Sequence, residues 1–359
     1  MIYIHVPLCR SFCTYCGFYS EVADAACKRR YLDALTAEIL SAKGKDPGLV
    51  NTLYFGGGTP SLLSAEDFAR ILAALDEAGF GSRFEELTVE ANPEDIVEKG
   101  PGYVEALLEL GVNRFSLGIQ SLDDGILRWM NRRHDAARAL RAAEILRAAG
   151  VKNLSVDLIF GVPGLTVPLW QETVARLLDA VAPEHLSAYQ LSIEEGSALE
   201  QKMAQGACVE VPEETCRAQY DGLCDEMRRR GYEHYEISNF ALPGFRSRHN
   251  SAYWMRVPYL GFGGGAHSFD GRTRSWNTPE LSGYHKESEI LTEEDAKLER
   301  IMLSLRMSDG APEKFLHDNC NTGVLGRLLS EGALVQKDGR IRIPEDRFFV
   351  SDEIIRELI

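Results

Sequence analysis

Three cysteines near the start of the chain have a spacing that suits redox chemistry. Cys9, Cys13 and Cys16 follow the pattern C-x3-C-x2-C in one short loop, directly after an apolar run at 2–6. Cysteine thiolates hold iron–sulfur clusters, normally with one thiolate on each iron of a four-iron cubane. Three thiolates leave one iron open, in the way that a catalytic metal site keeps one position for its substrate. The spacing therefore predicts a [4Fe-4S] cluster that can bind and cleave a small molecule.

Simpler interpretations of this loop fit the sequence less well. A zinc site normally pairs one C-x2-C with a second, distant pair, and the chain has no second C-x2-C. A lone cysteine is often a buried apolar residue, but here three lie within eight positions of a polar and aromatic loop. Among the remaining cysteines, the eight-residue spacing of Cys208, Cys216 and Cys224 predicts buried positions on a helix.

The elements that must position this loop follow from the pattern of the first 240 residues. Apolar runs predict strands at 2–6, 52–55, 86–90, 114–119, 153–159 and 185–191, and amphipathic stretches predict helices at 24–42, 65–78, 101–110, 136–149 and 168–181. Ser64 and Asp135 are placed as N-caps, and Gly111 and Gly150 as left-handed C-caps. Strands that alternate with helices indicate a parallel sheet of right-handed βαβ units. Six units predict an α/β fold, a partial (β/α)6 TIM-like barrel.

Unusual residues gather where these predicted strands end. They are the cysteine loop, the GGGTP segment at 56–60, the EANP segment at 90–93, Gln120-Ser121, Asp157 and Tyr189-Gln190. Barrel enzymes build their active sites at the carboxyl ends of the strands. The glycine triplet allows a close backbone approach to a ligand, and it is not a P-loop because no Gly-Lys-Ser/Thr follows. The sequence thus predicts one site at this rim.

The cysteine pattern resembles the signature of the radical S-adenosylmethionine (SAM) proteins. That resemblance implies that the open iron binds the amino and carboxylate groups of SAM, and that one electron cleaves a C–S bond to give methionine and a 5′-deoxyadenosyl radical. Further motifs resemble the HemN/HemW family over essentially the whole chain: 3–7 (YIHVP), 56–61 (GGGTPS), 90–93 (EANP), 116–122 (SLGIQSL), 131–134 (NRRH) and 156–164 (VDLIFGVPG).

The resemblance implies a role for each matching residue. Cys9, Cys13 and Cys16 would ligate the cluster. Arg132 can pair with a carboxylate, and Glu90 and Asp157 can accept hydrogen bonds from ribose hydroxyls or an amino group. The residues expected to line SAM are Tyr3, Tyr15, Gly57, Gly58, Thr59, Glu90, Gln120, Arg132, Asp157 and Leu191.

Two features distinguish the branches of this family. The segment 249–254 (HNSAYW) resembles the H-N-x-x-Y-W motif of the haem-chaperone branch. Coproporphyrinogen III dehydrogenases have a fourth cysteine where Phe18 stands here, and an extension before the first strand. Histidine can be an axial ligand of haem iron, and Tyr and Trp offer apolar faces to a porphyrin. The residues expected to contact haem are His249, Asn250, Tyr253 and Trp254, and His267 in the stretch 261–268 is a further candidate to face the cluster or haem.

The favoured hypothesis is a haem chaperone that binds a [4Fe-4S] cluster, SAM and haem and delivers haem to acceptor proteins such as respiratory enzymes. A flavodoxin or ferredoxin is the expected reductant, and SAM cleavage is expected without coproporphyrinogen oxidation. The alternatives are an oxygen-independent coproporphyrinogen III dehydrogenase, a radical haem-modifying enzyme, and an interaction protein without a cluster. The sequence leaves open whether the chain forms a homodimer or contacts a membrane through its partners.

Composition limits the class of protein. The 359 residues accommodate one α/β barrel of about 200–250 residues and a small module. The net charge of −15 argues against nucleic-acid binding, which needs clustered Lys and Arg. No run approaches the roughly 18–20 apolar residues of a membrane span, and no signal sequence is recognisable. Eight cysteines without such a signal predict reduced thiols in the cytoplasm.

Three regions are predicted. Residues 1–240 form the radical SAM partial barrel, and 241–296 form a connecting segment that carries the HNSAYW motif. Residues 297–359 form a winged-helix-like module with helices at 298–307, 324–329 and 351–359 and a hairpin at 335–343 that turns at Asp338-Gly339.

Overall fold

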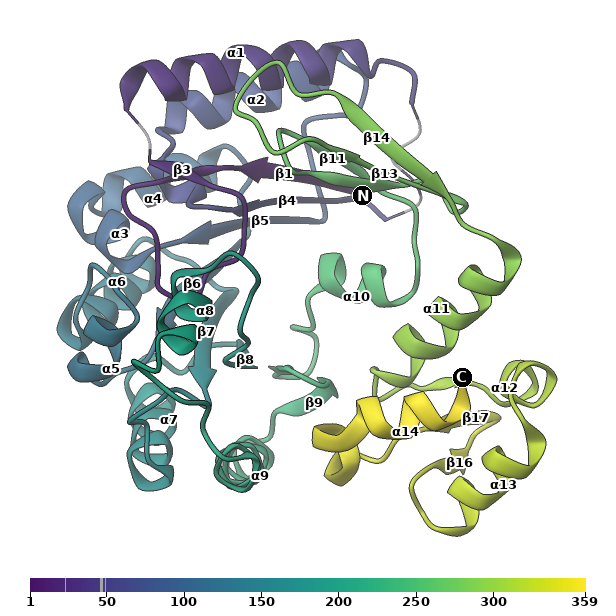
Figure 1. Ribbon diagram of the computed structural model, residues 1–359. Coiled ribbons are helices and arrows are strands. Elements are labelled where there is room, and N and C mark those ends of the chain that lie inside the picture. Colours follow the sequence, from purple (N-terminus) through teal and green to yellow (C-terminus); the bar gives the residue numbers. More distant parts are fainter. Residues whose placement is uncertain (23, 46–47, 49) are drawn as a thin grey trace.

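Six neighbouring parallel strands form the centre of the molecule, as the alternation of strand and helix patterns predicts (Figure 1). The computed structural model describes residues 1–22, 24–45, 48 and 50–359. Within these residues the main sheet has the order β11-β1-β4-β5-β6-β7-β8-β10-β9. Its strands are β1 (Ile2–Val6), β4 (Thr52–Gly57), β5 (Glu86–Ala91), β6 (Arg114–Gln120), β7 (Leu154–Phe160), β8 (His185–Gln190), β9 (Glu233–Glu236), β10 (Asn239–Ala241) and β11 (Leu260–Phe262).

Helices cover the convex outer side of this curved sheet (Figure 1). They bury apolar faces against it, and Ser64 and Asp135 cap two of them as predicted. These helices are α1 (Ala25–Ser41), α2 (Ala65–Glu77), α3 (Pro93–Lys99), α4 (Pro101–Glu109), α5 (Asp124–Trp129), α6 (Ala136–Ala148), α7 (Val167–Val181) and α9 (Glu213–Arg229), with a short 3-10 turn η1 (Pro60–Leu62). The short helix α8 (Ala198–Ala204) instead lies by the cysteine loop, where Leu199 N–H donates to Thr14 O at 2.8 Å. The predicted α/β partial barrel is confirmed.

The structure also extends and corrects the sequence-based prediction. The strand β11 joins β1 in parallel, and β10 joins β8 in antiparallel orientation. The segment 241–296 therefore contributes a strand to the main sheet. Cys216 and Cys224 lie on α9 as predicted, but Cys208 lies in the segment between α8 and α9, so its placement on a helix is wrong.

Three smaller sheets accompany the main sheet in the described residues, one of them in the C-terminal module. Strands β12 (His267–Phe269), β13 (Thr273–Asn277) and β14 (Lys286–Ile290) form an antiparallel sheet beside β11, and the short strands β2 (Leu8–Cys9) and β3 (Glu21–Val22) pair within the cysteine loop. The helix α10 (Arg248–Trp254) lies between the main sheet and the C-terminal elements (Figure 1).

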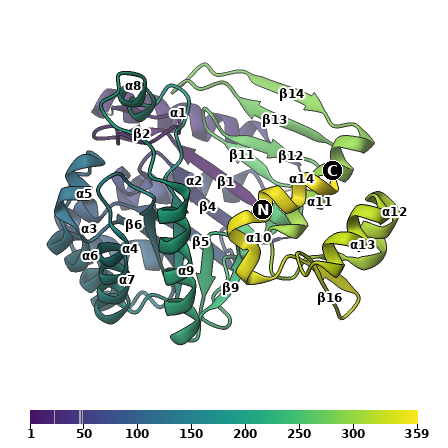
Figure 2. The same ribbon diagram turned by 60° about the horizontal axis from the view of Figure 1, so that its bottom comes forward.

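The C-terminal module lies on the side of the molecule away from α3–α7 (Figure 2), and it packs against α9, where the ring of Phe349 meets that of Tyr220 with centroids 5.5 Å apart. Its hairpin turns at Asp338 and Gly339, both with positive φ, as expected for the predicted two-residue turn. Hydrogen bonding from Ser308 N–H to Tyr235 O at 2.9 Å joins the module to β9. Its elements are α11 (Glu293–Leu305), β15 (Ala311–Pro312), α12 (Glu313–Asn319), α13 (Thr322–Ser330), β16 (Val335–Lys337), β17 (Arg340–Arg342), η2 (Glu345–Val350) and α14 (Ser351–Leu358). In the described residues, no helix combines the length and apolarity that crossing a membrane requires.

Candidate functional site

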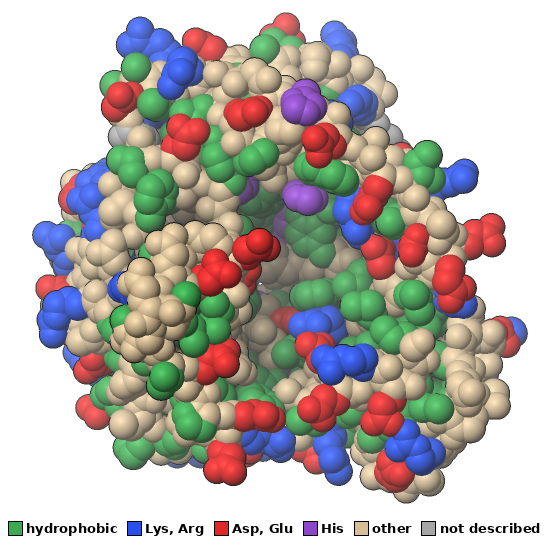
Figure 3. Space-filling view, viewed as in Figure 1, with side chains coloured by type: hydrophobic (Ala, Val, Ile, Leu, Met, Phe, Trp, Pro, Cys, Tyr) green, Lys and Arg blue, Asp and Glu red, His purple; other side chains and the backbone are tan. Residues whose placement is uncertain are grey.

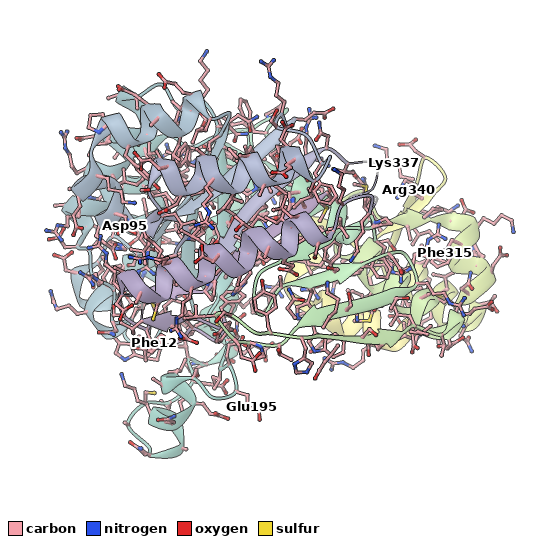
Figure 4. The ribbon with its side chains drawn as sticks, turned by 90° about the horizontal axis from the view of Figure 1, so that it is seen from above. Phe12, Asp95, Glu195, Phe315, Lys337 and Arg340 are labelled. Carbon is pink, nitrogen blue, oxygen red and sulfur yellow. The ribbon has the colours of Figure 1, made fainter. Side chains whose placement is uncertain are left out.

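The cysteine loop is fixed to the segment that follows β6. The backbone N–H of Thr14 donates to Met130 O at 3.0 Å, and its hydroxyl donates to Trp129 O at 3.1 Å. The side-chain amide of Asn131 donates to Phe12 O at 2.7 Å. These bonds hold the loop over the carboxyl ends of the strands. Figure 4 shows Phe12 and Asp95 at this end of the molecule, and Phe315 and Arg340 of the C-terminal module at the other.

A cavity of about 970 Å³ opens beneath this loop and runs along the concave face of the sheet. Figure 3 shows this face hollowed at its centre. The volume lies at the upper end of the usual range for small-molecule sites, so the cavity has room for a cofactor as large as SAM. The predicted residues that line it are Cys9, Cys13, Cys16, Tyr15, Gly57, Gly58, Thr59, Glu90, Gln120, Arg132, Asp157, Leu191 and Asn250.

The three cysteines are half-buried free thiols on the wall of this one cavity. Burial raises the pKa of Cys16 to about 11, and the nearby Cys13 and Cys9 add to the shift. In the described residues no three His, Cys, Asp or Glu side chains converge on a point that a single ion would occupy. A four-iron cubane needs a different arrangement of its thiolate ligands, because each thiolate binds a different iron. Three thiols spread along one wall fit that group better than they fit a single metal ion.

Arg132 lies against the cysteine loop and is held from several sides. Its guanidinium donates to Asn92 Oδ1 at 2.7 Å, to Gly118 O at 2.8 Å and to Cys13 Sγ at 3.4 Å. Its Nε is buried without a hydrogen-bond partner in the structure, and so is Oε1 of Gln120. Buried polar atoms are normally satisfied, so these two are suited to a polar ligand in the cavity.

Two carboxylates lie deeper in the cavity. Glu90 accepts hydrogen bonds from Tyr54 Oη at 2.7 Å and from Gly57 N–H at 3.2 Å. Asp157 accepts from the hydroxyl of Ser116 at 3.1 Å. Burial raises the pKa of Glu90 to about 7, and the charge of Asp157 adds to the shift. Burial likewise raises the pKa of Asp157 to about 6. A bound ligand that carries a positive charge or hydroxyl groups would therefore stabilise the ionised form of both carboxylates.

The raised pKa of Glu90 predicts a pH-dependent gain of stability in Glu90→Gln. Because the folded-state pKa is about 7 and the ordinary value is 4.5, ionised Glu90 destabilises the fold increasingly as the pH rises through this window. We expect the variant to melt a few degrees above the parent at pH 8, with the difference narrowing towards pH 5, in thermal unfolding without added ligand. Glu105→Gln, at an exposed position on α4, is the control and should show no such trend. Equal melting temperatures at pH 8 would contradict the prediction.

The glycine triplet is explained by its contact with the end of β1. Gly57 has φ of +107°, and a Cβ at this position would lie 2.6 Å from the His5 ring. A Cβ on Gly58 would lie 2.9 Å from Val6 O and from Leu8 O. Side chains are therefore excluded at both positions, and the backbone of this segment forms part of the cavity wall.

Four predicted residues lie outside the cavity wall. The hydroxyl of Tyr3 hydrogen-bonds to His5 Nδ1 at 3.1 Å. His249 is 1% exposed, and its ring nitrogens bond to Thr52 Oγ1 at 2.9 Å and to Tyr253 Oη at 3.2 Å. Trp254 packs beneath the guanidinium of Arg306. The four are Tyr3, His249, Tyr253 and Trp254, and the further candidate His267, exposed at the first position of β12, lies outside the wall as well.

The reason for the burial of His249 is the anchoring of α10. Glu86, the first residue of β5, accepts hydrogen bonds from the backbone N–H groups of Arg248 at 2.9 Å and His249 at 2.8 Å. A carboxylate is favourable at a helix N-terminus. These contacts place the HNSAYW motif at the amino ends of the strands, away from the cysteine loop. The ring of His249 is buried in this arrangement, and its role in haem binding stays a prediction.

Sequence reasoning missed the polar residues inside the strands. Every second residue of β6 lines the cavity, which is the periodicity of a strand with one face towards a lumen. Polar residues at alternate positions of otherwise apolar strands were the available signal. The residues missed in this way include Tyr54, Arg114, Ser116, Ser155 and Ser187.

Known proteins resemble this chain over most of its length. The model of the radical SAM superfamily matches residues 3–177. The chain is 33% identical to "Heme chaperone HemW" of Lactococcus lactis over 87% of this chain and 83% of that protein. It is 34% identical to the protein of the same name from Bacillus subtilis, over 87% of this chain and 84% of that protein. In Mycobacterium tuberculosis such a protein is 31% identical, over 100% of this chain and 94% of its own length.

The same architecture occurs in a solved structure. The coproporphyrinogen III oxidase HemN of Escherichia coli superimposes on this chain with a TM-score of 0.79, at 21% sequence identity. The superposition covers 99% of this chain and 89% of the HemN chain. This likeness establishes the fold of the whole chain, including the elements that follow the barrel.

Proposed function

Because this chain belongs to the HemN/HemW family of radical SAM proteins, we propose that it is a haem chaperone that binds a [4Fe-4S] cluster, SAM and haem and passes haem to acceptor proteins. The observation that carries the SAM part of this proposal is the position of Cys9, Cys13 and Cys16 on the wall of one large cavity, beside a buried Arg132. The haem part rests on the similarity to the HemW proteins.

The residues of the cavity have distinct roles in this proposal. When bound, the cluster supplies the electron that cleaves a C–S bond of SAM. Cys9, Cys13 and Cys16 hold the cluster. Arg132 neutralises charge beside Cys13 and holds the carboxylate of SAM, with its unpaired Nε available for that contact. Glu90 and Asp157 accept hydrogen bonds from the amino group or the ribose hydroxyls.

Phe18 favours the chaperone over coproporphyrinogen oxidation. In the dehydrogenase branch a fourth cysteine occupies this position in the motif. Here the aromatic side chain is 70% exposed and lies at the rim of the cavity, so this position offers no thiolate. We propose respiratory enzymes as the haem acceptors and a flavodoxin or ferredoxin as the source of electrons.

The test combines two assays on the anaerobically reconstituted protein. In the first, protein loaded with haem is mixed with a haem-free respiratory cytochrome, and the spectrum of the acceptor is followed. In the second, coproporphyrinogen III and SAM are supplied with a reductant, and the porphyrin products are separated. We expect haem transfer in the first and no protoporphyrinogen IX in the second. Formation of protoporphyrinogen IX without haem transfer would overturn the proposal.

A further inference from the structure

Arg114 is a buried positive charge on the wall of the cavity. It is the first residue of β6, and it is 2% exposed. Among the described residues, hydrogen bonds engage its Nη1 alone, which donates to Asn153 Oδ1 at 2.8 Å and to Phe245 O at 3.4 Å, and no carboxylate forms an ion pair with it. Buried arginine side chains normally have a counterion. The guanidinium therefore has donors left for an anionic group of a ligand.

The carboxylates of this region do not supply that counterion. Glu86 accepts hydrogen bonds from the backbone N–H groups of Arg248 and His249 at the start of α10. Asp157 accepts from the hydroxyl of Ser116. Burial raises the pKa of Asp157 to about 6, and the charge of Arg114 offsets only part of that shift. The two groups thus interact at longer range, without a direct pair.

Arg114 lies beyond the residues expected to line SAM. Glu90 and Asp157 are the register partners of Ser116 and Gly118 on β6. Arg114 precedes these partners by two and four residues, which is about 7 and 13 Å towards the amino end of the strand.

The cavity has a cationic side chain at each end of β6. Arg132, which we assign to the SAM carboxylate, comes from the segment that follows this strand, and Arg114 begins the strand. Among the described residues, these two are the arginines and lysines on the cavity wall. The wall therefore offers a second place for an acidic group, apart from that of SAM.

Arg114 is also joined to the segment that leads into α10. It donates to Phe245 O, two residues before Ser247, the N-cap of α10, whose hydroxyl accepts from Asn250 N–H at 3.2 Å. Ser247 and Asn250 both line the cavity. The HNSAYW motif thus meets the cavity, through its Asn250, at the end that carries Arg114.

We propose that Arg114 binds a propionate carboxylate of haem, beside Asn250 of the HNSAYW motif. This inference rests on the proposed haem-chaperone function and identifies one contact of its ligand. A guanidinium can donate two parallel hydrogen bonds to a carboxylate, and Nε and Nη2 of Arg114 are the donors left for such a pair. The hydroxyl groups of Ser155 and Ser187 lie on the same wall and make this region polar.

The experiment compares ferric haem with its dimethyl ester, in which both propionates are neutral, in titrations followed by the Soret band. We expect the parent to bind haem at least about tenfold more tightly than the ester, because the ester lacks the charge that pairs with Arg114. In Arg114→Gln this preference should fall below about twofold, while the affinity for the ester stays at the parent value. A folding defect would weaken the binding of both compounds, so it would not produce this pattern.

Arg147→Gln is the matched control. Arg147 also donates to backbone carbonyl oxygens, those of Val151 and Ala182, but it does not line the cavity. This variant should keep the parent preference for haem. Arg114→Lys retains the charge without the planar fork and should keep part of the preference. The SAM affinity of Arg114→Gln should equal that of the parent.

The outcomes separate the two levels of the proposal. If Arg114→Gln prefers haem over the ester as strongly as the parent does, or if it loses SAM binding, the assignment of Arg114 is overturned while the chaperone function stands. The same follows if the parent binds haem and the ester equally well. A parent that binds neither compound would overturn the proposed function and the assignment together.

Discussion

Replacing any one of Cys9, Cys13 and Cys16 with alanine is expected to abolish the [4Fe-4S] cluster and SAM binding with it. Each thiolate holds a different iron, so the loss of one leaves two ligands for a cluster that already has an open corner. The cavity offers no spare thiol, because the cysteines on its wall, among the described residues, are these three. Iron and sulfide content after anaerobic reconstitution, followed by equilibrium binding of SAM, measures the effect.

Cys27→Ala provides the matched control for this series. Cys27 is a half-buried free thiol on α1 and does not line the cavity, so its replacement should leave iron content and SAM affinity at the parent values. If one of the three alanine variants kept four irons and bound SAM with the parent affinity, the cysteine replaced in that variant would not be a ligand of the cluster.

The second large effect is expected for Arg132→Ala, which should weaken SAM binding by about a hundredfold, equivalent to about 3 kcal/mol. The substitution removes the buried guanidinium, and with it the charge-assisted pair that the guanidinium forms with the SAM carboxylate in a site that holds little water. It also removes the bonds to Asn92 and Cys13, so iron content must be measured in the same samples. Arg132→Lys keeps the charge without the planar fork and should restore only part of the affinity.

Arg138→Ala, at an exposed position on α6, is the control for a general loss of positive charge. It should bind SAM as tightly as the parent does. An Arg132→Ala protein with a full cluster and unchanged SAM affinity would refute the role given to this side chain.

The sequence was sufficient to predict the six parallel strands and five of the helices that cover them. Local patterns determine both, because strand and helix periods and caps such as Ser64 are read within a few residues. The cysteine loop and the residues that end the strands were brought to one cavity because parallel strands share one carboxyl edge.

Local sequence patterns could not predict the position of the HNSAYW motif in the fold. It depends on Glu86 binding the first turn of α10 across more than 160 residues of sequence, a contact that no local pattern encodes. The exposure of His267 depends in the same way on the pairing of β12 with β13, which orients the ring beside Trp276. Tertiary contacts thus determine the burial of His249 and the exposure of His267.

The most direct measurement is the electron paramagnetic resonance (EPR) spectrum of the reduced, reconstituted protein with and without SAM. An iron with an open position must change its spectrum when the amino and carboxylate groups of SAM occupy it. We predict a reduced [4Fe-4S] signal that shifts on addition of SAM in the parent, and no cluster signal in the three cysteine variants. A cluster signal that saturating SAM leaves unchanged would contradict the central claim that these thiols hold a cluster with a vacant corner in the cavity.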